Sequence, residues 1–424
     1  MRVAENVPPQ PSSGETLEER VNRLERELDE LRAQRPAPTP QAPAHAGGTT
    51  GPIANASEGT SHAATRATVT LSGYVEAFYQ WNFNQPSNGI TNYRGYDNRH
   101  NTFTLSNAVL DASGTLGPIT AHVALQVGDT PDSYYLSEPS LPGTAVVAAT
   151  GPSVFRFIQQ ANVAWTAPLG RGLTIDAGIF LSPIGPEGIA VKDQWNWSRS
   201  DLFFALPAYH TGARVTYPFT DRWSASLQLY NGWNSVVDNN PEKSIAAQLT
   251  YNVADRVTYQ FLYFTGVERP VGAPEGRAWR HLFDTYLALY PRPWLATLVH
   301  FDGGVEPNAF GDSGWAAGAL YLRFHPRKWM YLAARGDFFY EWIARDATGS
   351  AAPIFWGGAS WMSSATATLD VRPWDDVSFR LEYRHDQAAA PLFFDGQVLV
   401  DAMSNFVPNA RSQETITLGA TAWF

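Results

Sequence analysis

Val377-Ser378-Phe379-Arg380-Leu381-Glu382-Tyr383-Arg384 alternates apolar or aromatic side chains with polar or charged ones at every second residue. Successive side chains of a β-strand point to opposite faces, so a period of two predicts a strand with one apolar and one charged face. The same alternation runs through residues 224–229, 244–251 and 365–371. Charges in the middle of such strands indicate that their polar face meets water along its whole length.

Stretches of this kind, about ten to fourteen residues long, follow one another over residues 69–424, and we count sixteen of them. Their connections alternate between two lengths. The short ones are residues 117–118, 168–172, 218–222, 252–256, 291–293, 325–328 and 372–376. The long ones are residues 84–100, 130–153, 182–207, 232–241, 267–279, 302–314, 341–358 and 386–413.

Segregation of loop lengths decides between two folds that share the alternating pattern. A soluble β-sandwich turns its apolar face inward and has no reason to sort its loops by length. Outer-membrane barrels have short periplasmic turns, long external loops and an even number of strands. We therefore predict an all-β fold, a transmembrane antiparallel up-and-down β-barrel of about sixteen strands with its apolar face toward lipid.

Composition supports a membrane barrel and excludes several function classes. No run of about 18 apolar residues exists that would form a membrane-spanning helix. The chain has no cysteine, which excludes disulfides and thiol chemistry, and its formal net charge of −10 argues against a nucleic-acid partner. Aromatic residues cluster beside the short turns, as in an interfacial belt: Trp165, Phe219, Trp223, Tyr251, Tyr290, Trp294, Phe324, Trp329 and Trp374.

Three regions differ in composition: residues 1–35, 36–68 and 69–424. The first contains a heptad seam, which predicts a short α-helical coiled coil: Leu17, Val21, Leu24, Leu28 and Leu31. An isolated helix of this length is marginal in water, so we expect a dimer or trimer, although a lone amphipathic helix packed on something else would show the same pattern. Residues 36–68 are rich in Pro, Ala and Gly and read as a linker.

Several segments resemble a known family, the outer-membrane β-barrel porins of group two. They are residues 73–79, 82–88, 97–103, 231–240, 279–285 and 381–384, and the similarity extends over nearly all of residues 69–424. The resemblance implies a barrel in the bacterial outer membrane. It transfers no catalytic or ligand motif, and the coiled coil lies outside it, where it is similar only loosely to extensions of some trimeric porins.

A barrel of sixteen strands leaves an aqueous lumen that needs a constriction to select solutes. The best candidate is the loop of residues 182–207, which is anchored by prolines and rich in bulky or charged residues: Lys192, Asp193, Trp195, Trp197, Arg199 and Asp201. By strand parity the wall facing it carries charges of both signs, which predicts mild ion selectivity. These pore-lining candidates are Glu76, Asp176, Arg214, Arg323, Arg335, Asp337, Asp370, Arg380, Glu382 and Arg384.

Alternative roles exist for some of these residues. Trp195 and Trp197 would suit stacking on a sugar, although packing of the loop is the simpler interpretation. Alternatively, the charged wall residues simply neutralise one another around a water-filled lumen. A barrel hydrolase would draw its base from residues such as His281 or His300, but no nucleophile motif accompanies them.

The function that fits best is an outer-membrane porin for passive diffusion of small polar solutes or ions, narrowed by residues 182–207. The alternative is a plugged structural or adhesive outer-membrane protein, tethered to the cell wall through the coiled coil. We expect no enzymatic activity, cofactor or metal. Expected partners are outer-membrane lipid, lipopolysaccharide and two further copies in a homo-trimer, with possible peptidoglycan contact by a periplasmic N-terminal helix. Residues 1–15 lack the apolar core of a signal peptide, so we expect the precursor to carry one.

The seam predicts that assembly and pore formation are separable. Replacing both Leu24 and Leu28 with Asp removes two core positions of the coiled coil, whereas barrel closure and lipid hold the pore. Cross-linking of the double variant should show the loss of helix association, while heat-modifiable mobility and bilayer conductance stay unchanged. Failure of the variant to insert would show that the helix takes part in folding of the barrel.

Overall fold

The computed structural model describes residues 67–135 and 153–424. The predicted coiled coil, with its seam from Leu17 to Leu31, and almost all of the predicted linker lie outside the described residues. The first barrel strand begins at Thr68.

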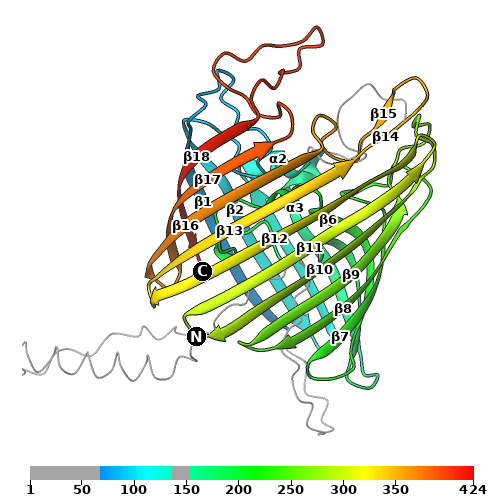
Figure 1. Cartoon of the computed structure of the whole chain (residues 1–424). Helices are drawn as coiled ribbons and strands as arrows, with labels where there is room; N and C mark the ends of the chain where they lie inside the picture. Colours follow the sequence, from blue (N-terminus) through cyan, green and yellow to red (C-terminus); the bar gives the residue numbers. More distant parts are fainter. Residues whose placement is uncertain (1–66, 136–152) are drawn as a thin grey trace, which may run out of the picture. The chain divides into compact units, whose positions relative to one another are not determined.

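Antiparallel strands follow one another around a closed barrel, and β1 pairs with β18 to complete the ring (Figure 1). The predicted all-β fold with sixteen barrel strands is thus confirmed. The strands are β1 (Thr68–Asn82), β2 (Thr102–Leu116), β3 (Ile119–Val127), β4 (Ile158–Ala167), β5 (Leu173–Leu181), β6 (Tyr209–Pro218), β7 (Trp223–Tyr230), β8 (Ser244–Val253), β9 (Val257–Val267), β10 (Trp279–Arg292), β11 (Leu295–Asn308), β12 (Gly311–Arg327), β13 (Met330–Trp342), β16 (Trp361–Trp374), β17 (Val377–Ala388) and β18 (Ser412–Trp423).

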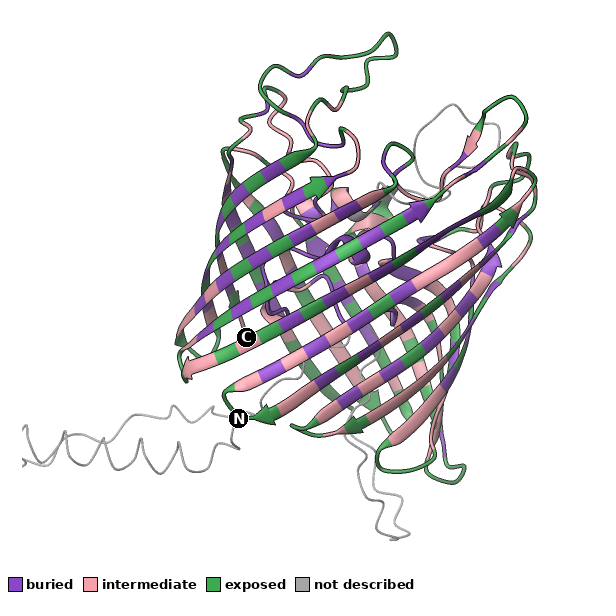
Figure 2. Cartoon of the chain, viewed as in Figure 1, coloured by how far each residue is buried: buried purple, intermediate pink, exposed green. Residues whose placement is uncertain are grey.

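Burial alternates from residue to residue along the strands (Figure 2). In β17, Phe379 and Leu381 are exposed, whereas Arg380 and Glu382 are buried. The apolar face therefore points outward and the charged face inward, the reverse of a soluble protein. An exterior of exposed aliphatic and aromatic side chains suits contact with lipid.

Short elements occupy the longer connections: α2 (Asp129–Tyr135), η1 (Ser153–Phe157), η2 (Val191–Asp193), α3 (Asp201–Phe204), β14 (Ala344–Arg345) and β15 (Ala351–Ala352). None of the helices in the described parts of the chain is long and apolar enough to cross a membrane. The carboxyl end of the chain lies at the end of the barrel with the short turns, since the Trp423 amide donates to the carbonyl of Asp376 in the turn after β16.

One predicted long loop, residues 302–314, is wrong. β11 continues to Asn308 and β12 begins at Gly311, so the two strands form an extended hairpin. The glycines that suggested a loop serve close packing instead: a Cβ at Gly304 would lie 2.2 Å from the Trp315 ring, and one at Gly314 would lie 2.3 Å from the Trp342 ring. Glycine within a strand can mark such a close approach as readily as a turn.

The predicted aromatic belt lies mostly where the sequence placed it. Trp165, Trp294 and Trp329 are exposed on the outer surface beside the short turns. Tyr290 is the exception, because it packs against the apolar cluster inside the barrel.

Candidate functional site

The connection between β5 and β6, residues 182–208, runs inside the barrel, and we call it the inner loop. Between residues 182 and 202 every residue is buried except Ala190, Lys192 and Asp193. Its short helix α3 is capped by Ser200, whose hydroxyl accepts a hydrogen bond from the Phe203 amide. A loop buried in this way must find partners for its backbone polar groups.

Carboxylates of the barrel wall accept hydrogen bonds from amides of the inner loop. Glu382 on β17 accepts from the Trp197 amide and, at 2.9 Å, from the Ser198 amide. Glu76 on β1 accepts from the Val191 amide. Asp337 on β13 likewise accepts from the Asp201 amide at 2.9 Å.

Arginines of the same wall donate to carbonyls of the inner loop. Arg380 donates to the carbonyls of Gln194 and Asn196 at 2.8 and 3.0 Å. Arg335 donates to the carbonyls of Ser198 and Arg199 at 2.7 and 3.0 Å. Hydrogen bonds to charged groups contribute roughly 1.5–3 kcal/mol each, so the set fixes the loop firmly to the wall.

Ion pairs neutralise the arginines of this wall. Arg380 contacts Asp370 at 2.7 Å, and Arg335 contacts Asp337 at 3.0 Å. Arg384 bridges the wall and the loop, since it lies 2.7 Å from Asp201. Burial of such charges is tolerated because each has an opposite charge and further hydrogen-bond partners.

Two further features shape the contact between the loop and the wall. Gly419 on β18 faces the Trp197 ring, and a Cβ at this position would lie 2.2 Å from it. The Asn196 side chain donates to the Thr368 hydroxyl on β16 at 2.7 Å. A glycine and a short hydroxyl therefore leave space that the loop fills.

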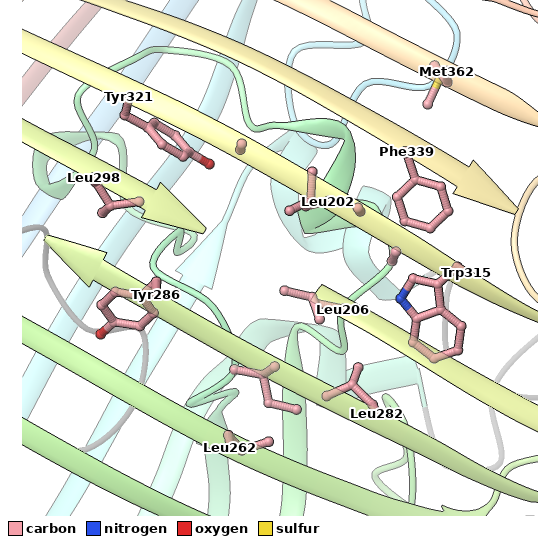
Figure 3. Close-up of a cluster of buried hydrophobic side chains, with 14 of the residues drawn as sticks. Leu202, Leu206, Leu262, Leu282, Tyr286, Leu298, Trp315, Tyr321, Phe339 and Met362 are labelled. Atoms are coloured by element: carbon pink, nitrogen blue, oxygen red, sulfur yellow. The ribbon is translucent and has the colours of Figure 1, made fainter. Parts of the chain in front are cut away.

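Apolar packing attaches the inner loop to further strands of the wall. Leu202 and Leu206 of the inner loop belong to a buried cluster that includes Leu282, Leu298 and Phe339 of the wall (Figure 3). At the end of the loop near β9 and β10, Gln260 donates to the Pro183 carbonyl at 2.6 Å. These contacts attach the inner loop to strands from β9 round to β18 and β1, and apolar packing of Ile189 and Ala190 adds contacts with β2, β3, β5 and β6.

The opposite side of the lumen differs in burial and chemistry. Inward-facing residues of β4 to β8 near the short turns are polar and partly exposed, among them Asn162, Thr174, Thr216, Gln248 and Thr250. Polar groups on this side form pairs: Arg214 contacts Asp176 at 3.0 Å, and the His122 ring on β3 contacts Asp111 on β2 at 2.8 Å. On the loop, Lys192 pairs with Asp193 at 2.9 Å.

All ten predicted wall residues lie on the inner side of their strands, but they do not form one lining. Glu76, Arg335, Asp337, Arg380, Glu382 and Arg384 are buried beneath the inner loop, and Asp370 is buried in its pairs with Arg372 and Arg380. Asp176 and Arg214 lie on the opposite side. Strand parity identified the inner face correctly, but it carries no signal for which of its residues a loop will cover.

Within the inner loop, only Lys192 and Asp193 of the six predicted constriction residues are partly exposed. Trp195, Trp197, Arg199 and Asp201 are buried. Neither tryptophan ring is therefore available for stacking on a sugar, and both rings pack the loop.

Residues considered for a hydrolase lie apart. His300 is buried inside the barrel with its Nε2 2.6 Å from Asp284, whereas His281 lies on the outer face and contacts the Tyr263 hydroxyl at 2.8 Å. Across the described residues, His, Asp and Glu form no group that could hold a metal ion.

Taken together, the closed barrel, the apolar exterior and the inward loop define an outer-membrane channel. The chain matches the family described as "Putative beta-barrel porin-2, OmpL-like" over residues 68–424. It belongs to this family.

Solved structures show the same fold at low sequence identity. The anion-selective porin from Comamonas acidovorans is 11% identical with a TM-score of 0.51, and the match covers 85% of this chain and 100% of that one. The outer membrane channel DcaP of Acinetobacter baumannii is 10% identical with a TM-score of 0.51, covering 84% and 97%. OmpT of Vibrio cholerae in its trimer form is 9% identical with a TM-score of 0.50, covering 84% and 99%. No curated protein matches the sequence.

Family and fold place the chain in the outer membrane as a porin, a channel for passive diffusion. They point to a channel rather than an enzyme.

The contacts of Glu382 predict how the inner loop responds to mutation. Glu382→Ala removes the acceptor for two loop amides, which should weaken attachment of the loop by roughly 1.5–3 kcal/mol for each bond lost. Single-channel recordings should show larger and noisier currents because the loop moves. Glu414→Ala is the matched control, since Glu414 is exposed on β18, and its currents should equal those of the unchanged protein. Unaltered currents in Glu382→Ala would show that this carboxylate does not hold the loop.

Proposed function

We propose that solutes cross the barrel between the free side of the inner loop and the wall formed by β3 to β8. The free side consists of Lys192 and Asp193, next to Ala190, which packs against Val109 and Ala124 of the wall. One observation carries the proposal: the hydrogen bonds that hold residues 183–201 to the wall come from β1, β9, β10, β13, β16 and β17, whereas Ile189 and Ala190 meet β2, β3, β5 and β6 through apolar packing. Inward-facing residues under the loop are buried, whereas Asn162 and Thr250 on the other side keep contact with solvent.

Pairing of charges along this route supports small polar solutes as cargo. Asp176 is neutralised by Arg214, and Lys192 by Asp193, so the narrow part of the route presents no ring of one sign. Selectivity of a pore follows the net charge of its lining, which is close to balanced here. Of the residues predicted from sequence, we retain Asp176, Arg214, Lys192 and Asp193 as lining of the route.

A plugged structural protein is the second candidate, because the buried cluster around Leu202 and Phe339 fills much of the other side. In that case the barrel would show no conductance at any voltage. Mutations of the inner loop would then change stability alone.

We further propose assembly as a homo-trimer in lipid and lipopolysaccharide. Support comes from the trimer form of the V. cholerae protein, at the level of the fold, and from the heptad seam of residues 17–31. Since β1 begins at the end with the short turns, which face the periplasm in outer-membrane barrels, the preceding segment would emerge there and could reach peptidoglycan. The outer-membrane location also implies a secretion signal on the precursor.

Cysteine labelling tests the proposed route, because the chain contains no cysteine of its own. A charged methanethiosulfonate reagent should reduce the conductance of Asn162→Cys and Thr250→Cys, since both positions line the route. The same reagent should leave Ser364→Cys and Thr366→Cys unaffected, because both side chains are buried under the inner loop. If the reagent reduced the conductance of Ser364→Cys and Thr366→Cys but not that of Asn162→Cys and Thr250→Cys, the proposed route would be wrong, because solutes would then pass on the other side of the inner loop.

A further inference from the structure

Arg323 on β12 differs from the other arginines that point into the barrel. Those residues each contact a carboxylate: Arg214, Arg280, Arg335, Arg372, Arg380 and Arg384. Arg323 makes no hydrogen bond or ion pair with any residue that the structure describes, and its Nε atom is buried without an acceptor. A buried guanidinium donor without an acceptor is costly, so this position needs a further partner.

The surroundings of Arg323 leave room for such a partner. Its register neighbours are Ala296 on β11 and Ala333 on β13, whose methyl groups are too short to reach the guanidinium. The guanidinium lies 4.7 Å from the centre of the Trp195 ring and 5.8 Å from that of Tyr331. The aromatic rings orient the cation, and the Tyr331 hydroxyl, which donates to carbonyls of the inner loop, forms no hydrogen bond with Arg323.

The charge around Arg323 is positive. Arg372 and Arg380 are its cationic neighbours, and both share a single carboxylate, Asp370, at 3.3 and 2.7 Å. Two guanidinium groups thus share one carboxylate, and Arg323 beside them has none. Tyr290, whose hydroxyl also lacks a hydrogen-bond partner in the described residues, adds a neutral donor nearby.

We propose that Arg323 and Arg372 form a binding site for small oxyanions, of the carboxylate or phosphate class, on the short-turn side of the inner loop. A guanidinium presents paired N–H donors that match two oxygens of such an anion. Arg323 and Arg372 are both partly exposed, so the site is reachable from that end of the barrel. The proposal rests on the proposed function. It adds one anion-binding position, near the periplasmic end, to a route that is otherwise nearly neutral.

Binding and conductance together test the site. Inorganic phosphate and acetate are titrated into the detergent-solubilised full-length protein by calorimetry, and their block of single-channel current is measured in bilayers. Arg323→Gln should weaken phosphate binding about tenfold or more, the loss expected for a hydrogen bond to a charged group. It should also lower the chloride-to-potassium permeability ratio. Arg323→Lys keeps the charge but loses the paired donors, so its phosphate affinity should lie between those of the unchanged protein and Arg323→Gln.

Arg327→Gln is the matched control, because Arg327 is exposed at the end of the same strand. Its affinity and permeability ratio should equal those of the unchanged protein. Comparison of phosphate with acetate shows which oxyanion the site prefers.

Each other outcome has a distinct meaning. If Arg323→Gln lowers thermal stability but leaves phosphate affinity and permeability ratio unchanged, Arg323 serves only to stack on Trp195. The proposed anion site would then be wrong, but the proposed porin function would be unaffected. If the unchanged protein does not conduct, the proposed route fails, and calorimetry still decides the anion site. Absence of phosphate and acetate binding to the unchanged protein would overturn the site directly.

Discussion

Hydrogen bonding between the charged inner wall and the backbone of the inner loop is the interaction on which the site depends. A loop inside a barrel is shielded from bulk water, so its amides and carbonyls need partners from the wall. Glu382 supplies acceptors, and Arg335 and Arg380 supply donors, each from a strand whose other face meets lipid. Burial of the two arginines is tolerated because each also pairs with a carboxylate, Asp337 or Asp370.

This attachment divides the lumen into two unlike sides. The inner loop and its apolar cluster fill the side from β9 to β18 and β1, and the cluster reaches Phe180, Tyr230 and Ala246 on β5, β7 and β8. Polar, partly exposed residues remain on β4 to β8 toward the short turns. Gly419 belongs to the first side because the Trp197 ring occupies the place of a side chain. Arg323 stands at the margin, where the loop covers it with Trp195 but offers it no oxygen.

Much of the fold was predictable from sequence, because alternation and loop length are direct consequences of strands that face lipid on one side and water on the other. The loop predicted at residues 302–314 failed since Gly304 and Gly314 make room for tryptophan rings, which no local pattern reveals. Parity placed Glu382 and Arg380 on the inner face, yet their role in holding the loop depends on contacts with residues more than a hundred positions away. Arg323 was predicted to face inward, but its lack of a carboxylate is visible only in three dimensions.

The central claim is that the inner loop acts as a fixed constriction in its attached position and is not a movable plug. Asn196→Cys combined with Thr368→Cys replaces a hydrogen-bonded pair of side chains between loop and wall, so that oxidation can lock the loop in place. Single-channel conductance of the double variant, measured before and after oxidation, tests the claim most directly. The account predicts that the locked channel conducts as well as the reduced one. Loss of current on oxidation, with recovery on reduction, would show that solutes pass only when the loop leaves the wall.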